Sequence, residues 1–328
     1  MSSSTSQLSF KFRFVKQGKA QGLFSQKGMA NEQEITFGKD LLVYEDIADT
    51  TTRDQRLVLA LSKTACFSKK LSKHLVNSVL VLEIYGGKCR DLEKFIDKRA
   101  SAKEIEKKKQ RLAQTGQLHR FRSVKCPECE ATIDLSDYKT STYVYCRFCE
   151  TIFQENLLSM TKGATYRLCD ECGMFDRVRS YTEFYFYFLV ILYGFFYQRR
   201  HVCDNCANGL FLKTLFLNLL FVIGVPASLW IKIKSLTGRD PYLKRLAKAN
   251  ALSKKGNYQT ADTIYNSLYE KYPEHPGLLM DAGLGHLRGN DPTGAIANFS
   301  RALKSCSNYE PLLRLMHQLQ TASQQKNG

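Results

Sequence analysis

Residues 124–153, VKCPECEATIDLSDYKTSTYVYCRFCETIF, contain two Cys-x-x-Cys pairs, and two further pairs follow as CDEC at 169–172 and CDNC at 203–206. Each pair presents two thiolates on one tight turn, and two such turns make a tetrahedral four-cysteine zinc site. We therefore predict two zinc ions per chain, each bound by two successive pairs. The predicted metal ligands are Cys126, Cys129, Cys146, Cys149, Cys169, Cys172, Cys203 and Cys206.

The segment from Cys126 to Cys149 resembles a zinc ribbon, because an alternating strand, TSTYVY, leads into its second pair. All four positions are thiolates, so the site has no open position for water, and no pair of His or Glu residues stands nearby to act as a base. The zinc is therefore expected to supply folding free energy rather than catalysis.

The second unit differs, because the aromatic run FYFYFLVILYGFFY (184–197) lies between Cys172 and Cys203. Three alternatives to a shared zinc stay open here: a different pairing of the knuckles, a redox-active dithiol, and His201 as a substitute ligand. The dithiol usually needs a thioredoxin-like βαβ context, which the sequence lacks.

Length and charge set the broad class. A chain of 328 residues is long enough for two or three domains, and its net charge of +17 favours an anionic neighbour, either nucleic acid or a lipid surface. Metal use of paired cysteines fits a reducing compartment. The start of the chain lacks the apolar region of a signal peptide, so translocation is not expected. The three isolated cysteines, Cys66, Cys89 and Cys306, are expected to be buried.

The N-terminal part reads as strands followed by a helix. LSFKFRFV alternates, with Leu8, Phe10, Phe12 and Phe14 on one face, and further short strands lead to a helical pattern at 90–113. This order of elements resembles a pleckstrin-homology-like domain. The resemblance implies a small β domain of a kind that hosts lipid, peptide or protein ligands.

The end of the predicted helix is basic, from Lys103 through Arg111 and on to Lys125. Such a run is either a solvated face or a patch that binds anionic headgroups or nucleic acid. Aromatic residues around it are sparse, with only Phe95 and Phe121, whereas binding of single strands relies on stacking platforms. Nucleic acid is therefore a partner that we do not favour.

Two apolar runs raise the question of a membrane. Residues 184–197 would span only about 21 Å as a helix, but 214–231 (TLFLNLLFVIGVPASLWI) reaches the usual length of a spanning helix and ends near Trp230. We predict a membrane segment at 211–234 that binds lipid through 214–231, with 184–197 as a second candidate. The alternative is a buried helix in a soluble core.

Flanking positive charge is greater after 214–231 than before it, which predicts a cytosolic C-terminal side. One span would then place the predicted zinc units outside the cytosol, and two spans would separate Cys169 and Cys172 from Cys203 and Cys206. The number of spans stays open. We predict a membrane-associated protein with its soluble domains facing the cytosol.

The C-terminal part carries a repeat with a shift of 34 residues. Ala261 matches Ala295, Tyr265 matches Phe299, and Pro273 lies where a turn between repeats is expected. This period and these residue types resemble the tetratricopeptide repeat. The resemblance implies paired helices and binding of a protein or peptide by residues 242–320, and the alternative is a helical spacer.

The predicted architecture is multidomain α+β: an antiparallel β domain with a C-terminal helix, two zinc ribbons, an apolar membrane segment and helical repeats. The predicted function is a non-enzymatic, membrane-associated scaffold, and the alternative is a soluble zinc-ribbon protein that binds nucleic acid. No Gly-rich phosphate loop, nucleophile elbow or His-x-x-x-His site points to an enzyme. The predicted boundaries are 1–7 (disordered), 8–118 (β domain and basic helix), 119–160 (first ribbon), 161–210 (second ribbon with its aromatic insert), 211–234 (membrane segment) and 235–328 (helical repeats).

Overall fold

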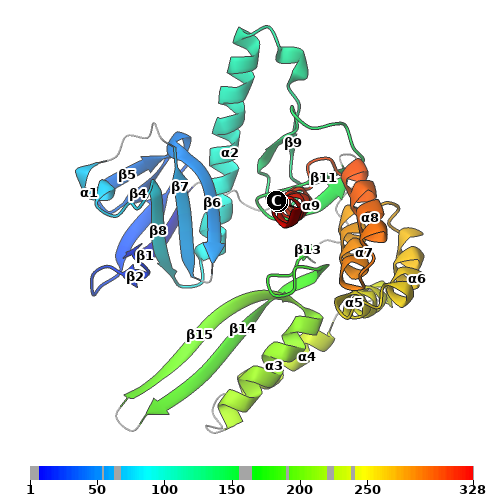
Figure 1. The fold of residues 1–328 in the computed structure, drawn as a ribbon. Coiled ribbons are helices and arrows are strands. Elements are labelled where there is room, and N and C mark those ends of the chain that lie inside the picture. Colours follow the sequence, from blue (N-terminus) through cyan, green and yellow to red (C-terminus); the bar gives the residue numbers. More distant parts are fainter. Residues whose placement is uncertain are drawn as a thin grey trace. The chain divides into compact units, whose positions relative to one another are not determined.

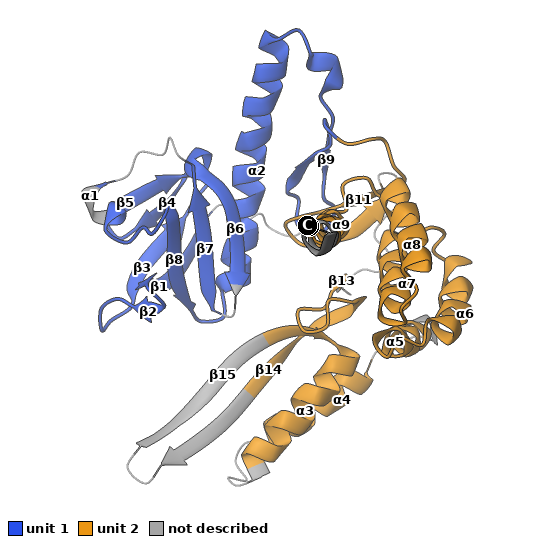
Figure 2. Cartoon of the chain, in the orientation of Figure 1, with its two compact units in different colours: residues 1–137 blue, residues 138–328 orange. Residues whose placement is uncertain are grey.

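The computed structural model divides the chain into two compact units, residues 1–137 and 138–328 (Figure 2). The residues that the structure describes are 7–53, 55–62, 68–154, 165–189, 192–219, 225–237 and 241–327.

The first unit is built on a curled antiparallel sheet, whose strands follow the spatial order β5-β4-β3-β1-β8-β7-β6, with β2 beside β1 (Figure 1). As the alternation of the sequence predicts, β1 points Phe10, Phe12 and Phe14 into the core. The strands are β1 (Leu8–Lys16), β2 (Lys19–Ala20), β3 (Gln26–Ala30), β4 (Glu34–Phe37), β5 (Asp40–Val43), β6 (Ile47–Arg53), β7 (Arg56–Leu61) and β8 (Val79–Tyr85).

Helix α2 (Cys89–Gln114) covers this core with its first turns, where Leu92 and Ile96 are fully buried. The same unit ends in a short hairpin of β9 (Ser123–Lys125) and β10 (Thr132–Asp134), which packs against α2. The smaller helical elements of the unit are η1 (Tyr44–Asp46), α1 (Lys69–Ser72) and η2 (Leu118–Arg120).

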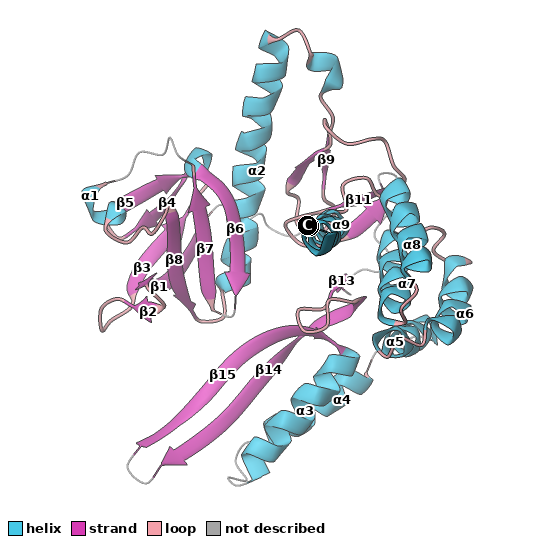
Figure 3. Ribbon diagram, in the orientation of Figure 1, coloured by secondary structure: helices cyan, strands magenta, loops and turns pink. Residues whose placement is uncertain are grey.

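The second unit joins two small sheets to a helical tail (Figure 3). Strand β11 (Tyr143–Tyr145) pairs with β12 (Ile152–Gln154), and β13 (Thr165–Leu168) pairs with the long hairpin of β14 (Phe175–Leu189) and β15 (Leu192–Cys203). The candidate segment 184–197 therefore lies in a β hairpin, and its residues 190 and 191 lie outside the described residues.

Helices α3 (Asp204–Leu219) and α4 (Val225–Leu236) pack on each other and on β14. They replace the predicted membrane segment at 211–234, and residues 220–224 between them lie outside the described residues. At 1.5 Å per residue, helices of 16 and 12 residues are about 24 and 18 Å long, short of the roughly 30 Å of a hydrocarbon core.

In the described part of the chain, no helix has both the length and the apolar character needed to cross a membrane. The predictions of a membrane segment and of membrane-associated localisation were therefore wrong, whereas lipid as a partner stays a prediction. Their physical error was to read 214–231 as one helix, although its described residues belong to α3 and α4. The two helices share a polar contact instead, in which buried Asn218 donates to Ser228 Oγ at 3.2 Å.

The tail consists of helices joined by short turns, as predicted. Its repeat is visible in α6 and α8, where Ala261, Tyr265, Ala295 and Phe299 are all buried. Capping is repeated too, because an Asx side chain accepts a backbone N–H at the start of both helices. The tail comprises α5 (Pro241–Lys254), α6 (Tyr258–Tyr269), α7 (Pro276–Arg288), α8 (Pro292–Ser305) and α9 (Glu310–Asn327).

Candidate metal centres

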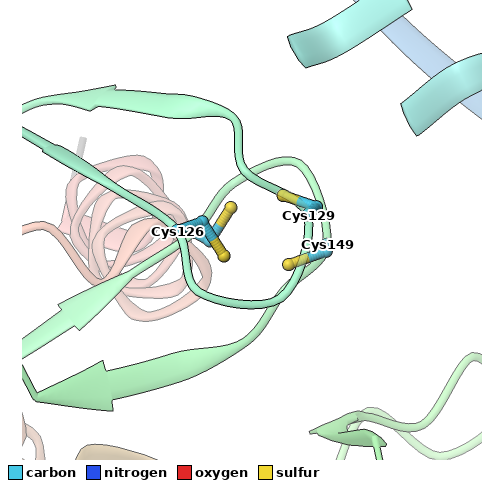
Figure 4. Close-up of side chains that lie close together, drawn as sticks. Cys126, Cys129 and Cys149 are labelled. Carbon is cyan, nitrogen blue, oxygen red and sulfur yellow. The ribbon is translucent and has the colours of Figure 1, made fainter. Parts of the chain in front are cut away.

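Two groups of four cysteines could each hold one metal ion. In each group the four Sγ atoms lie within 4.8 Å of one another, and they come from successive Cys-x-x-Cys pairs as predicted. The side chains of Cys126, Cys129 and Cys149 converge in the first group (Figure 4). The first centre consists of Cys126, Cys129, Cys146 and Cys149, and the second of Cys169, Cys172, Cys203 and Cys206.

Three of the four pairs share one backbone turn. The N–H of the first cysteine donates to the carbonyl five residues later, and its carbonyl accepts the N–H four residues later. That fourth residue is Glu130, Glu150 or Gly173, and each has a positive φ between 60° and 68°. The turn directs both thiols of the pair to the same side, which is what a shared metal ion requires.

The fourth pair is built differently. Cys203 ends β15, and Cys206 lies in the first turn of helix α3. The free N–H groups at a helix N-terminus favour a thiolate over a thiol. Sequence analysis missed this difference in backbone, although the apolar helical pattern that follows CDNC was its signal.

The donor set fits zinc. Four thiolates are a complete tetrahedral set for this ion, and a Zn–S distance of about 2.3 Å corresponds to an S–S separation of about 3.8 Å. Cys172 Sγ and Cys203 Sγ are 3.9 Å apart. With four sulfur ligands the ion would have no free position for a substrate or a water nucleophile, so it would hold the turns together.

Close packing of the sulfurs perturbs their pKa values. Hydrogen bonds from the thiols of Cys169, Cys203 and Cys206 hold the pKa of Cys172 far below its ordinary value. Hydrogen bonding to Cys169 and Cys172 raises the pKa of Cys203 instead. Among four thiols this close, some lose their proton more easily than others. A divalent metal ion would stabilise all four as thiolates by binding them together.

Helix α5 brings a positive charge to the second centre, because Lys254 Nζ lies 3.7 Å from Cys206 Sγ. Burial lowers the pKa of Lys254, but the hydrogen bond to Cys172 and the negative charges of Cys172, Cys203 and Cys206 outweigh it, so the pKa is raised. The ammonium group is therefore charged wherever the thiolates are.

A buried ion cluster adjoins the same centre at Asp204, the residue after Cys203. Asp204, inside the CDNC pair, accepts from Arg177 at 2.7 Å, from Arg179 at 3.0 Å and from the Tyr181 hydroxyl at 2.5 Å. Burial raises the pKa of Asp204, but these three donors lower it more. Sequence analysis missed the cluster, because Asp204 lies 23 to 27 residues after its three donors.

Buried polar side chains of the tail fix the strand that follows the third cysteine pair. Asp281 of α7 accepts the N–H of Phe175 at 3.0 Å, and Asn250 of α5 donates to the Phe175 carbonyl at 2.9 Å. Burial raises the pKa of Asp281 well above its ordinary value, which favours the neutral acid over the carboxylate. The tail thereby supplies hydrogen-bond partners for the N–H and the carbonyl of Phe175, the first residue of β14.

A matching contact secures the second pair of the first centre. Asn308, just before α9, accepts the N–H of Tyr145 at 3.0 Å and donates to its carbonyl at 2.8 Å. Tyr145 directly precedes Cys146. The tail thus contacts both β11 and β14 through buried side chains that bind backbone groups.

The other predicted candidates do not join the centres. His201 pairs with Ser180 in the β14–β15 ladder, and among the described residues it belongs to no group that could hold a metal. Cys89 and Cys306 are buried as predicted, and Cys66 lies outside the described residues. In the basic helix, Lys108 forms ion pairs with Asp134 and Asp137.

Comparison with known proteins finds no matching family model, no matching curated protein and no matching solved structure. The predicted tetratricopeptide-repeat assignment is therefore withdrawn in favour of a helical tail. The pleckstrin-homology-like resemblance of the N-terminal part likewise has no support from a family model.

Proposed function

We propose that the chain is a non-enzymatic scaffold, in which two structural zinc sites hold β hairpins against a helical tail that binds a protein partner. The observation that carries the proposal is the closed chemistry of the centres. Both offer four sulfur donors, and buried side chains of the tail bind the backbone beside both. A metal in such a setting supports the fold and is not available for chemistry.

The buried titratable groups of the second unit support a structural role as well. Burial lowers the pKa of His275 to about 3, and the His275 side chain caps the start of α7 by accepting the N–H of Gly277. Burial also raises the pKa of Asp176 to about 7, with the nearby charge of Asp204 adding to the effect. These groups lie in the packed core, where a substrate does not reach them.

The partner surface that we propose is the solvent side of the tail within 242–320. Ile296 on α8 is 56% exposed, although Ala295 beside it and Phe299 one turn later are buried. We choose Ile296 as the probe of this surface, because burial of an exposed apolar side chain against a partner is favourable.

The test uses the full chain loaded with zinc. Elemental analysis is expected to give two zinc ions per chain, and a folded chain free of metal would contradict the zinc sites. Ile296→Glu should then reduce capture of a partner from cell extract. The matched control is Leu41→Glu on β5, because Leu41 is 51% exposed but lies in the first unit.

Equal capture by both variants would place the partner surface elsewhere, and failure of the parent chain to retain any protein would refute the scaffold. Nucleic acid is the second candidate, but ion pairing of Lys108 and of Lys103, 3.0 Å from Glu45, reduces the free charge of the basic helix. Binding of DNA or RNA that falls by several orders of magnitude between low and moderate salt would favour it.

A further inference from the structure

Helix α5 lies along the second metal centre and meets it at three points. The side chain of Asn205, between Cys203 and Cys206, donates to the carbonyl of Ala247 at 2.9 Å. Further along, Asn250 donates to the carbonyl of Phe175 at 2.9 Å, and Lys254 Nζ reaches Cys206 Sγ at 3.7 Å.

The three α5 positions form a single stripe. Residues at i, i+3 and i+7 lie on one face of a helix, and Ala247, Asn250 and Lys254 have this spacing. The stripe therefore binds both halves of the centre, since Phe175 follows the CDEC pair and Asn205 belongs to the CDNC pair. These contacts join α5 to both halves of the centre.

Charge makes Lys254 the distinctive member of the stripe. Four thiolates around a divalent ion carry a net charge of −2, and leaving such charge in a poorly hydrated site without a counter-charge is unfavourable. Lys254 is half-buried and is the cation that the described contacts bring to these sulfurs. Its neighbour Lys255, which directly follows α5, is exposed.

We propose that Lys254 is a positioning residue of the second metal centre, and that it couples metal retention at this centre to docking of the helical tail. The proposal rests on the proposed function, because it requires that the centre binds zinc. Outer residues that donate to metal ligands commonly change metal affinity by about 10- to 100-fold when they are removed. Here such a residue belongs to the tail, so the tail and the metal would stabilise each other.

The experiment compares the zinc-loaded full chain with its Lys254→Met, Lys254→Arg and Lys255→Met variants. Each is mixed with excess zinc chelator and an alkylating reagent, and the rate at which each cysteine becomes alkylated is followed by peptide mass spectrometry. This readout resolves the two centres, so the first centre is an internal control in every sample.

We expect Lys254→Met to accelerate alkylation of the second-centre cysteines by about 10-fold or more, with the first centre unchanged. Lys255→Met should match the parent, and Lys254→Arg should stay close to it because the charge is kept. Hydrogen exchange should show the coupling directly: removal of zinc from the parent should accelerate exchange in α5 and α7.

Equal alkylation rates in Lys254→Met and the parent would overturn the proposal, as would a Lys254→Arg variant that loses metal as fast as Lys254→Met. If Lys254→Met does not fold, hydrogen exchange of the parent with and without zinc decides, and unchanged exchange in α5 overturns the coupling. Failure of the proposed function is distinguishable, because the second-centre cysteines of the parent would then be alkylated at once, with or without added zinc.

Discussion

Replacement of Asn308 by alanine should destabilise the second unit, because this side chain forms two hydrogen bonds to one buried residue. Tyr145 faces Ile152 across the β11–β12 ladder, and both its N–H and its carbonyl point to the Asn308 amide instead. The amide therefore takes the place of a neighbouring strand at this position.

The magnitude follows from the groups that lose their partner. A buried donor or acceptor left without a hydrogen bond costs about 1–3 kcal/mol, and Asn308→Ala leaves one of each on Tyr145. We therefore expect a loss of about 2–6 kcal/mol in the free energy of unfolding. For a unit of this size, each kcal/mol lowers Tm by about 2–4 °C, so Tm should fall by on the order of 10 °C.

The assay is thermal unfolding of the zinc-loaded chain followed by circular dichroism, with hydrogen exchange of the Tyr145 amide as a local probe. Asn298→Ala is the matched control, because the Asn298 amide donates once, to Gly294 within its own helix at 3.0 Å. The control should lose less than about 1 kcal/mol. The reasoning is refuted if Asn308→Ala unfolds like the control and its Tyr145 amide exchanges no faster.

Two further predictions concern α7. Because burial raises the pKa of Asp281, the folded chain keeps a proton that the unfolded chain releases above about pH 4, so this contribution to stability is complete below that pH and is lost as pH rises. Asp281→Asn should therefore gain stability relative to the parent between pH 5 and pH 8 in urea unfolding, and a difference that does not change with pH would contradict it. Gly283→Ala should lower Tm, because the new Cβ would lie 2.4 Å from a ring carbon of the fully buried Phe299, and overpacking of this kind costs about 1–3 kcal/mol. An unchanged Tm would show that the Phe299 ring can move aside.

The features that sequence predicted are those encoded within a few residues. A Cys-x-x-Cys pair fixes two ligands within one turn, so the eight sulfurs and their grouping into two sites followed from spacing alone. The alternation around Phe10, Phe12 and Phe14 likewise predicted a strand with one buried face. The small and aromatic residues of the repeat predicted the buried faces of helices α6 and α8.

The features that sequence did not predict depend on distant residues. Asp281 binds the N–H of a residue 106 positions earlier, and Asn308 binds one 163 positions earlier. An Asp or Asn in a helical pattern is usually interpreted as a solvent-exposed residue or a helix cap. Nothing in the neighbouring sequence identifies the strand whose backbone it will bind. Similarly, hydropathy of 214–231 measured apolar character but did not show that the described residues of this run belong to two helices.

The long-range contacts explain how so short a tail is stable. Two helical repeats seldom bury enough surface to fold alone, and three or more are usually needed. Here Tyr143, Tyr145 and Phe175, from the strands beside the two centres, belong to the same apolar cluster as Tyr265 and Phe299 of the repeat. These aromatic residues cover helix surface that a further repeat would otherwise bury. Loss of metal would free the strands that carry them, so the stability of the tail should depend on metal sites to which it contributes no sulfur.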